Sequence, residues 1–201
     1  MARNGTQKSI DRAQEIYLTA AQIFFTKGFD STSLNDIADA LGITKAGLYY
    51  YVESKQDLLF QIMNLGLDSV RNEVLLPAQK IADAESRLRF TILKHAQLSA
   101  GGNHAVVIIS DEITALNFTQ REKILKRRRI YFEFVRDTLV ELETEGKLHK
   151  IDITAATFTL LGMILWLARW FHSGGKLSVE KVCEEVCRMA LRSLLREPQT
   201  I

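Results

Sequence analysis

Proline, cysteine and glycine are scarce in this chain of 201 residues, which contains 2, 2 and 11 of them. So little proline permits long helices and disfavours a fold built from many short turns. Two cysteines exclude a scaffold held together by disulfide bonds. The longest uncharged run, residues 153–168, is shorter than the roughly 20 residues that a membrane-spanning helix needs. No apolar segment follows the polar N-terminus, so we expect no signal peptide.

The remaining composition is that of an ordinary folded protein. Hydrophobic residues make up 47% of the chain, charged residues 25%, and the formal net charge is +2. These values exclude a mainly disordered chain. We therefore expect a cytoplasmic protein with reduced thiols and no membrane segment.

Apolar residues recur every three or four positions along most of the chain, which is the period of an amphipathic helix. Residues 33–36, 54–57 and 119–122 each have the pattern of a capping box, which marks a helix start. Gly28 and Gly42 can adopt the left-handed conformation that ends a helix. No convincing strand alternation is present. The sequence predicts an all-α fold of about nine helices.

The later helices are expected near residues 81–100, 103–115, 119–145, 153–172 and 179–196. Pro77 interrupts the helical pattern before them and gives the clearest break in the chain.

Residues 34–58 carry the most informative pattern, LNDIADALGITKAGLYYYVESKQDL. Two short helices meet at the turn 41–44, which contains a glycine, and Ala38 is small where the helices would cross. This is the layout of a helix-turn-helix that reads DNA. Helical corners with a glycine are common in all-α proteins, so the layout alone favours DNA binding without establishing it.

A more specific pattern runs through the same residues: Ile-Ala-x-x-Leu-Gly-Ile-x-x-x-x-Leu-Tyr-x-Tyr-Val-x-x-Lys-x-x-Leu. It resembles the N-terminal signature of TetR/AcrR-family transcriptional regulators, and the resemblance covers about residues 10–60. It implies an all-α homodimer, in which residues 1–55 bind DNA and residues 56–201 bind a ligand and dimerise. It also implies a repressor that is released from its operator by a small hydrophobic effector.

The resemblance assigns DNA contacts position by position. Tyr49 and Lys55 occupy positions that contact backbone phosphates, and Lys55 lies at a helix N-terminus, where the dipole attracts anions. Tyr51 stands where many members have histidine, so its contact should depend less on pH. The full expected set is Thr32, Thr44, Lys45, Gly47, Tyr49, Tyr50, Tyr51 and Lys55.

The first 60 residues hold six basic and seven acidic side chains, a net charge of −1. Non-specific attraction to DNA should therefore be modest, and binding should depend on a few well-placed contacts. A module this small reads a short half-site. We therefore expect a dimer on a palindromic double-stranded operator, with the two recognition helices about 34–36 Å apart.

The expected helix at residues 153–172 is apolar on nearly all faces, which predicts burial on more than one side. The resemblance implies that this helix and the last one form a four-helix bundle across the dimer. The expected interface residues are Phe158, Leu161, Leu165, Val186 and Met189.

The segment Trp166-x-x-x-Trp170-Phe171-x-x-Gly-Gly-Lys-Leu-Ser is similar to one found in acyl-CoA-responsive members of the family. The implied effector is thus an acyl-CoA or another small hydrophobic molecule. The expected ligand contacts are Phe118, Arg128, Phe132, Trp166 and Trp170. The basic cluster at residues 121–129 is either a solvated helix face or a phosphate site, because arginine binds phosphate with two parallel hydrogen bonds.

Two other classes of function stay open from the residues alone. The first is a carrier of acyl thioesters or hydrophobic ligands whose helix-turn-helix does not bind DNA, which the negative module supports. The second is a helical enzyme acting on acyl thioesters, although no nucleophile and base are visible. The histidines lack metal-ligand spacing, and Cys183 and Cys187 fit small buried side chains. We expect no catalytic residue, metal or cofactor.

Overall fold

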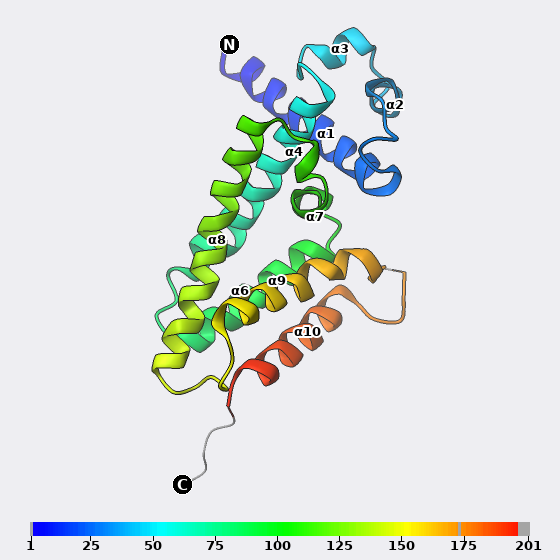
Figure 1. Ribbon diagram of the computed structural model, residues 1–201. Coiled ribbons are helices and arrows are strands. Elements are labelled where there is room, and N and C mark those ends of the chain that lie inside the picture. Colours follow the sequence, from blue (N-terminus) through cyan, green and yellow to red (C-terminus); the bar gives the residue numbers. More distant parts are fainter. Residues whose placement is uncertain (1, 173, 197–201) are drawn as a thin grey trace. The chain divides into compact units, whose positions relative to one another are not determined.

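A computed structural model describes residues 2–172 and 174–196, and these residues form helices and no strand (Figure 1). The elements are α1 (Ala2–Lys27), α2 (Leu34–Ala40), α3 (Lys45–Tyr49), α4 (Lys55–Ser69), η1 (Val70–Leu75), α5 (Leu76–Ala78), α6 (Ala84–Ala100), α7 (His104–Asp111), η2 (Ile113–Ala115), α8 (Phe118–Thr144), α9 (Ile153–Trp170) and α10 (Val179–Leu194). The predicted all-α fold is confirmed.

Local signals set the early helix boundaries as predicted. The Asp36 N–H donates to the Ser33 hydroxyl over 3.2 Å, and the Ser33 N–H donates to the Asp36 carboxylate over 2.7 Å. These hydrogen bonds complete the capping box at the start of α2. The Ser33 hydroxyl and then the Ser33 N–H, which both donate to the Asp36 carboxylate, lower the pKa of Asp36. Gly28 and Gly42 follow α1 and α2 with φ angles of +85° and +65°, which favour glycine.

The capping box predicted at residues 119–122 is not formed. α8 begins at Phe118, and the Asn117 side chain accepts a hydrogen bond from the Gln120 N–H over 2.9 Å. Asparagine is among the strongest N-cap residues, so it takes the role two positions before the threonine.

Pro77 does not end a helix, contrary to the sequence prediction. α4, η1 and α5 form one continuous helical segment, and η1 is a π-helix in which Leu76 N–H donates to the carbonyl of Arg71, five residues earlier. Proline lacks an N–H and its ring meets the carbonyl four residues before it. In the π-helical turns directly before Pro77, each N–H bonds to the carbonyl five residues earlier instead of four. The backbone is therefore not held in α-helical geometry next to the proline ring, and the helix continues to Ala78.

The first of two compact units contains residues 2–67 and 103–125. Its core is apolar, and its largest fully buried side chains include Ile16, Phe24, Ile37, Leu48, Leu58, Leu59, Ile62, Met63, Ile108 and Ile124. Gly66 of α4 lies directly against α7, because a Cβ at this position would come within 2.4 Å of the Ala105 carbonyl oxygen. α4 is thus held as far as Leu67 in the same core as α1, α2 and α3.

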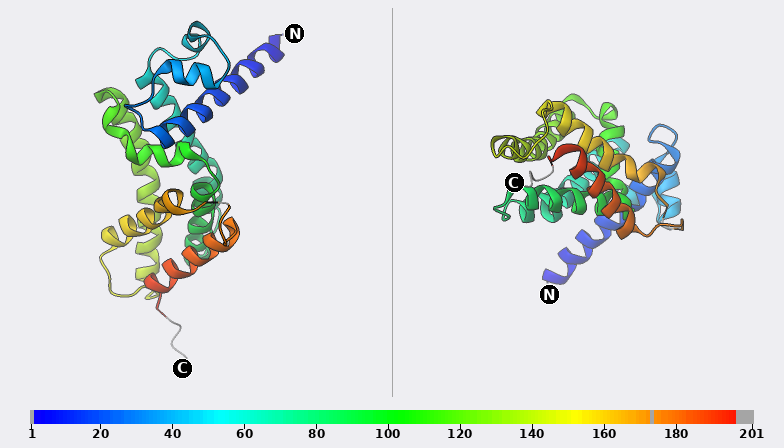
Figure 2. Two further views of the ribbon diagram at one scale, coloured as in Figure 1. Left: turned by 90° about the vertical axis from the view of Figure 1, so that its right-hand side faces the viewer. Right: turned by 90° about the horizontal axis from the view of Figure 1, so that it is seen from below.

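The second unit contains residues 68–102 together with the described residues after 125. Here α6 packs against both α9 and α10 (Figures 1 and 2). α8 meets α6 through long side chains. Arg87 of α6 donates to the Thr138 hydroxyl over 3.3 Å and forms an ion pair with Glu141.

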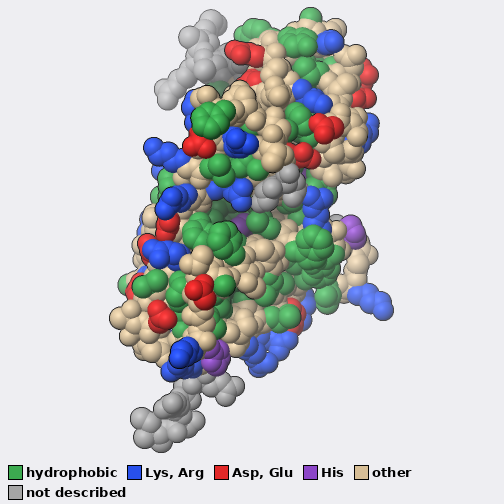
Figure 3. Space-filling model, viewed as in Figure 1, with side chains coloured by type: hydrophobic (Ala, Val, Ile, Leu, Met, Phe, Trp, Pro, Cys, Tyr) green, Lys and Arg blue, Asp and Glu red, His purple; other side chains and the backbone are tan. Residues whose placement is uncertain are grey.

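α9 is exposed along one apolar face in the single chain, and the sequence predicts that a second side of this helix faces a dimer partner. The outward residues include Phe158 and Trp166, each 64% exposed, and Trp170, 48% exposed. Figure 3 shows hydrophobic side chains at the surface of this unit. By length and composition α9 could also cross a membrane, and only 28% of it is buried. A single helix of this kind is weak evidence for a membrane segment, since helices of soluble proteins pass the same test.

Candidate functional site

The turn between α2 and α3 forms a fixed corner. Ile43 N–H donates to the Ala38 carbonyl over 3.0 Å, and the positive φ of Gly42 turns the chain between the two helices. Ile37, Ala38 and Leu48 are buried beneath the corner. The predicted helix-turn-helix is therefore formed, with α3 in the place of the recognition helix.

The first turn of α3 is capped by Thr44, whose hydroxyl oxygen accepts a hydrogen bond from the Gly47 N–H over 3.0 Å. The hydroxyl proton of Thr44 stays available for another acceptor. Lys45 is exposed, with its Nζ 6.0 Å from the centroid of the Tyr49 ring. These predicted DNA contacts therefore lie together at the N-terminal end of α3.

The three consecutive tyrosines are exposed to different degrees. Tyr50 is 79% exposed and Tyr49 is 48% exposed, whereas Tyr51 is half-buried. The Tyr50 and Tyr51 rings meet edge to face with centroids 5.0 Å apart. A large exposed aromatic side chain with a hydroxyl suits a surface that binds a polar partner.

Lys55 is engaged within the protein. Its ammonium donates hydrogen bonds to the carbonyls of Phe29, Asp30 and Thr32 over 2.9, 3.4 and 3.0 Å. It also lies 4.3 Å from the centroid of the Phe29 ring. All three N–H donors of the side chain are therefore directed at the turn between α1 and α2.

Thr32 belongs to the same turn. It is 2% exposed, and its hydroxyl donates to the Gly28 carbonyl over 2.8 Å. In this structure Thr32 and Lys55 hold the turn together, whereas Thr44, Lys45, Tyr49 and Tyr50 present free surface.

The residues expected to contact the effector do not form one cluster. Phe132 of α8 packs on Phe158 of α9, with ring centroids 4.6 Å apart, so an expected ligand residue touches an expected interface residue. Trp166 and Trp170 lie four and eight residues after Gly162 on the exposed face of α9. Phe118 is 71% exposed and belongs to the first unit.

The residues expected at the dimer interface also differ in exposure. Met189 of α10 is 60% exposed, Leu161 and Leu165 are half-buried, and Val186 is buried. The exposed apolar surface thus consists of Phe158, Trp166, Trp170 and Met189. We call these four residues the α9–α10 face.

The basic cluster on α8 divides into residues with different surroundings. Arg127 forms an ion pair with Asp68, and Arg129 forms one with Glu133 over 3.3 Å. Arg128 is half-buried, and burial lowers the pKa of its guanidinium. No ion pair or hydrogen bond of Arg128 occurs with any residue that the structure describes. Arg128 therefore offers a half-buried guanidinium to an anionic group.

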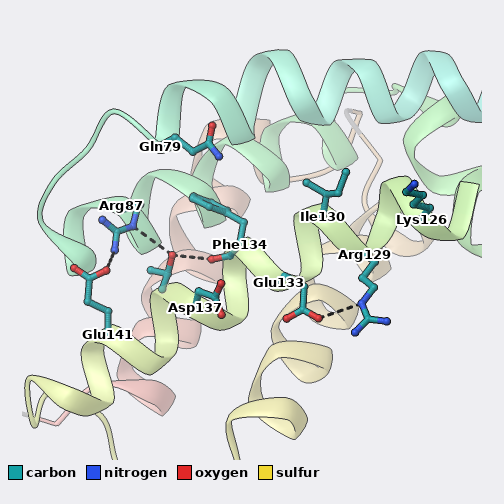
Figure 4. A pocket seen from close by; sticks show the side chains of 10 residues that line it. Gln79, Arg87, Lys126, Arg129, Ile130, Glu133, Phe134, Asp137 and Glu141 are labelled. Carbon is teal, nitrogen blue, oxygen red and sulfur yellow. Dashed lines mark hydrogen bonds and ion pairs between the residues drawn. The ribbon is translucent and has the colours of Figure 1, made fainter.

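A groove of about 630 Å³ runs along α8 in the second unit (Figure 4). Gln79 and Arg87 line it opposite α8, and Ile130 and Phe134 contribute apolar surface. Its charged residues largely neutralise one another, because Arg87 pairs with Glu141 and Arg129 with Glu133. The groove therefore has little attraction for a strongly charged ligand.

The other candidate chemical groups are unreactive in this structure. Burial raises the pKa of the Cys183 thiol to about 11 and also raises that of Cys187. Both thiols thus stay protonated, and a protonated thiol is a poor nucleophile. Among the described residues, no group of three or more His, Cys, Asp or Glu side chains could hold a metal ion.

Two family models match the chain. The one described as "Bacterial regulatory proteins, tetR family" matches residues 16–62, which include α2, α3 and the turn between them. The one described as "Tetracyclin repressor-like, C-terminal domain" matches residues 82–194.

Similar proteins agree with these matches. The HTH-type transcriptional repressor KstR2 of Rhodococcus jostii is 25% identical over 185 residues, 91% of each chain. AibR, solved in complex with isovaleryl coenzyme A and operator DNA, is 32% identical with a TM-score of 0.81, over 89% of this chain and 97% of AibR. KstR2 of Mycobacterium tuberculosis shares the fold, with a TM-score of 0.84 over 92% of this chain and 96% of that one at 23% identity. The chain belongs to the TetR family of DNA-binding transcriptional regulators.

Proposed function

We propose that this protein is a homodimeric repressor that binds a palindromic operator through α3 and is released by an acyl-CoA. The observation that carries the proposal is the exposed surface of α3 and its two caps, where Thr44 and Lys45 lie at the N-terminal end and Tyr49 and Tyr50 at the C-terminal end. AibR, which matches most of this chain, binds both operator DNA and an acyl-CoA.

The DNA contacts divide into two kinds in this proposal. Thr44, Lys45 and Gly47 approach base edges, because they occupy the N-terminal turn of the recognition helix. Tyr49 and Tyr50 donate to phosphates, which fix the register of the helix on the duplex. We assign DNA reading to residues 1–55 and effector binding and dimerisation to residues 56–201.

The α9–α10 face supports the homodimer. Large apolar side chains at this exposure are costly in water, and a second copy of the chain removes them from solvent. A family of dimeric DNA-binding regulators favours that partner over a membrane. We place Trp166 and Trp170 on this face because, like Phe158, they are exposed on α9.

Effector release follows from linkage between two sites. Arg128 supplies a half-buried cation for an anionic part of the effector, and the apolar interior of the second unit suits an acyl chain. AibR is found with both ligands at once, so we expect effector binding to weaken operator binding without excluding it. A coupling free energy of about 1–3 kcal/mol corresponds to roughly 5–150-fold weaker DNA binding.

The test is fluorescence anisotropy with duplex DNA from upstream of the protein's own gene, at stated salt, with a scrambled duplex as competitor. Selective binding that acyl-CoA weakens is the expected result. Selective binding unaffected by a panel of acyl-CoAs would reject this effector class. No selective binding, also after selection from genomic fragments, would favour the carrier function instead.

A further inference from the structure

Six polar residues are buried in the described part of the chain, and their hydrogen bonds separate them into two groups. Thr32, Thr91, Thr138 and Thr157 each donate to a carbonyl four residues earlier, over 2.7 to 2.9 Å. Such local hydrogen bonds satisfy a buried hydroxyl without any acceptor from a distant part of the chain. His95 and Ser99 are the two that do not follow this rule.

His95 and Ser99 lie one turn apart on the buried side of α6, where they are 3% and 2% exposed. The Nδ1 atom of His95 is 3.1 Å from the hydroxyl of Tyr131 on α8. The Ser99 hydroxyl has no hydrogen-bond partner among the residues that the structure describes. An unpartnered buried hydroxyl is costly in a folded protein, so its presence calls for an explanation.

The three groups are uncharged at neutral pH. Burial lowers the pKa of His95 to about 4 and raises the pKa of Tyr131 above its ordinary value. His95 can therefore accept the Tyr131 proton at Nδ1 and donate from Nε2. An uncharged buried cluster favours a neutral oxygen and disfavours a carboxylate or phosphate, which would lose its hydration without gaining a counter-charge.

The surroundings of the cluster are those of the proposed effector domain. Arg128 and Phe132 lie three residues before and one residue after Tyr131 on α8, and Phe132 packs on Phe158 of α9. Long side chains bridge α6 and α8 here, as His95 and Tyr131 do. The half-buried Arg128 and the neutral cluster therefore offer two chemically distinct binding groups in one unit.

We infer that His95, Ser99 and Tyr131 form a polar subsite that binds an uncharged oxygen of the effector, namely the thioester carbonyl or an oxygen on the acyl chain. The inference rests on the proposed acyl-CoA effector and adds its mode of recognition. The Ser99 hydroxyl and His95 Nε2–H supply hydrogen-bond donors from α6, and Tyr131 of α8 orients the His95 ring through Nδ1. An effector oxygen then satisfies the Ser99 hydroxyl, for which the described residues offer no partner.

The experiment measures binding of three matched ligands to the full-length protein by isothermal titration calorimetry. The ligands are octanoyl-CoA, its thioether analogue S-octyl-CoA, which lacks the carbonyl, and 3-hydroxyoctanoyl-CoA. If the subsite reads the thioester, octanoyl-CoA should bind about tenfold more tightly than S-octyl-CoA, as expected for one or two neutral hydrogen bonds. If it reads an acyl-chain oxygen, the hydroxylated ligand should be preferred by a similar factor.

Two variants distinguish binding of an effector oxygen from a purely structural role of these residues. Ser99→Ala and Tyr131→Phe should each reduce the preference to less than about threefold. Ser99→Ala should leave the melting temperature of the unliganded protein unchanged or higher, because it removes an unsatisfied hydroxyl. Thr91→Val is the matched control on the same side of α6; its hydroxyl is already bonded to the Arg87 carbonyl, so it should leave ligand preference intact.

The outcomes distinguish the inference from the function on which it rests. Equal binding of all three ligands, or a preference that Ser99→Ala and Tyr131→Phe leave unchanged, overturns the subsite alone. Binding of none of the three ligands, with selective operator binding intact, rejects the acyl-CoA effector and the subsite with it.

Discussion

α3 and α9 both expose large aromatic side chains, but of different chemical kinds. α3 exposes Tyr49 and Tyr50, whose hydroxyls can bond to water or phosphate, over a core that is apolar. α9 exposes Phe158 and Trp166, over an interior that contains His95 and Ser99. The first surface is stable in water and still able to bind DNA, whereas the second leaves hydrocarbon exposed until a partner covers it.

The contrast corresponds to the different functions of the two units, DNA reading and effector sensing. A DNA-reading unit needs exposed contacts held in a fixed geometry, which the caps of α3 and the buried residues beneath it provide. A sensing unit must respond to a small molecule and, in a dimer, to a partner, so an uncovered apolar face is consistent with its role. Four predictions test this difference, from the largest expected effect to the smallest.

The double variant Phe158→Glu with Trp166→Glu should convert the dimer to a monomer. Two carboxylates in an apolar interface would be buried without partners, which the interface cannot compensate. Operator affinity should fall by more than about 100-fold, because one half-site alone binds weakly. Sedimentation velocity and anisotropy measure both effects. Lys94→Glu, a charge reversal on the exposed side of α6, is the control, and a variant that stays dimeric would contradict the assignment of this face.

His95 should make the protein less stable in acid. Its pKa is lowered to about 4 by burial, so between pH 6.5 and 4 the unfolded chain binds a proton that the folded chain does not. The free energy of unfolding should therefore fall as the pH falls through this window, by about 1.4 kcal/mol per pH unit, or about 2 kcal/mol at pH 5.

Urea unfolding at pH 7.5 and pH 5 measures this dependence. His95→Gln should remove most of it, and the exposed His149→Gln should retain it. An equal pH dependence in all three proteins would show that His95 is solvated in the folded state.

Lys55→Met should lower the free energy of unfolding by about 1–2 kcal/mol, because three carbonyls lose a charged donor. The salt dependence of operator binding should keep its slope, since no phosphate contact is removed. Lys45→Ala is the comparison: it should leave stability unchanged and reduce the preference for the operator over scrambled duplex, because a base-edge contact is lost.

The family resemblance assigns Lys55 to a phosphate, which predicts the opposite pattern for the same variant. A reduced slope without loss of stability for Lys55→Met would therefore restore that role. Thermal unfolding and anisotropy over a salt series decide between the two.

Gly162→Ala adds one methyl group next to the α9–α10 face and has the smallest expected effect of the four changes. A Cβ at Gly162 meets no atom within 4 Å in the protomer, and alanine favours the helix. In the monomeric double variant it should stabilise the fold by about 0.5–1 kcal/mol. In the dimer the gain should be smaller, because the methyl group enters the interface. Chemical unfolding of both backgrounds measures the difference, and an equal gain in both would place Gly162 outside the contact.

Helix boundaries could largely be predicted from the sequence, because caps and terminal glycines act within four residues. Ser33 with Asp36, Gly28 and Gly42 all behave as the local pattern indicates. The prediction was wrong at the start of α8, where Asn117 caps the helix instead of Thr119. It was also wrong at Pro77, where π-helical turns before the proline let the helix continue.

The candidate site was predictable only in part. The exposed end of α3 follows from the motif, but the engagement of Lys55 depends on carbonyls more than 20 residues away, which spacing does not reveal. The sequence contains one pattern that indicates the polar subsite. Thr91, His95 and Ser99 recur every four residues along an otherwise apolar side of α6. The partner of His95 lies on another helix, so only the structure brings Tyr131 to it.

The α9–α10 face has a consequence for how the regulator responds to its own abundance. If two copies must meet to cover this face, the concentration of DNA-binding dimer rises with the square of the chain concentration while monomers predominate. A twofold drop in synthesis then leaves about a quarter of the dimer, as mass action requires. Operator occupancy would then switch over a narrower range of expression than for a monomeric repressor of equal affinity.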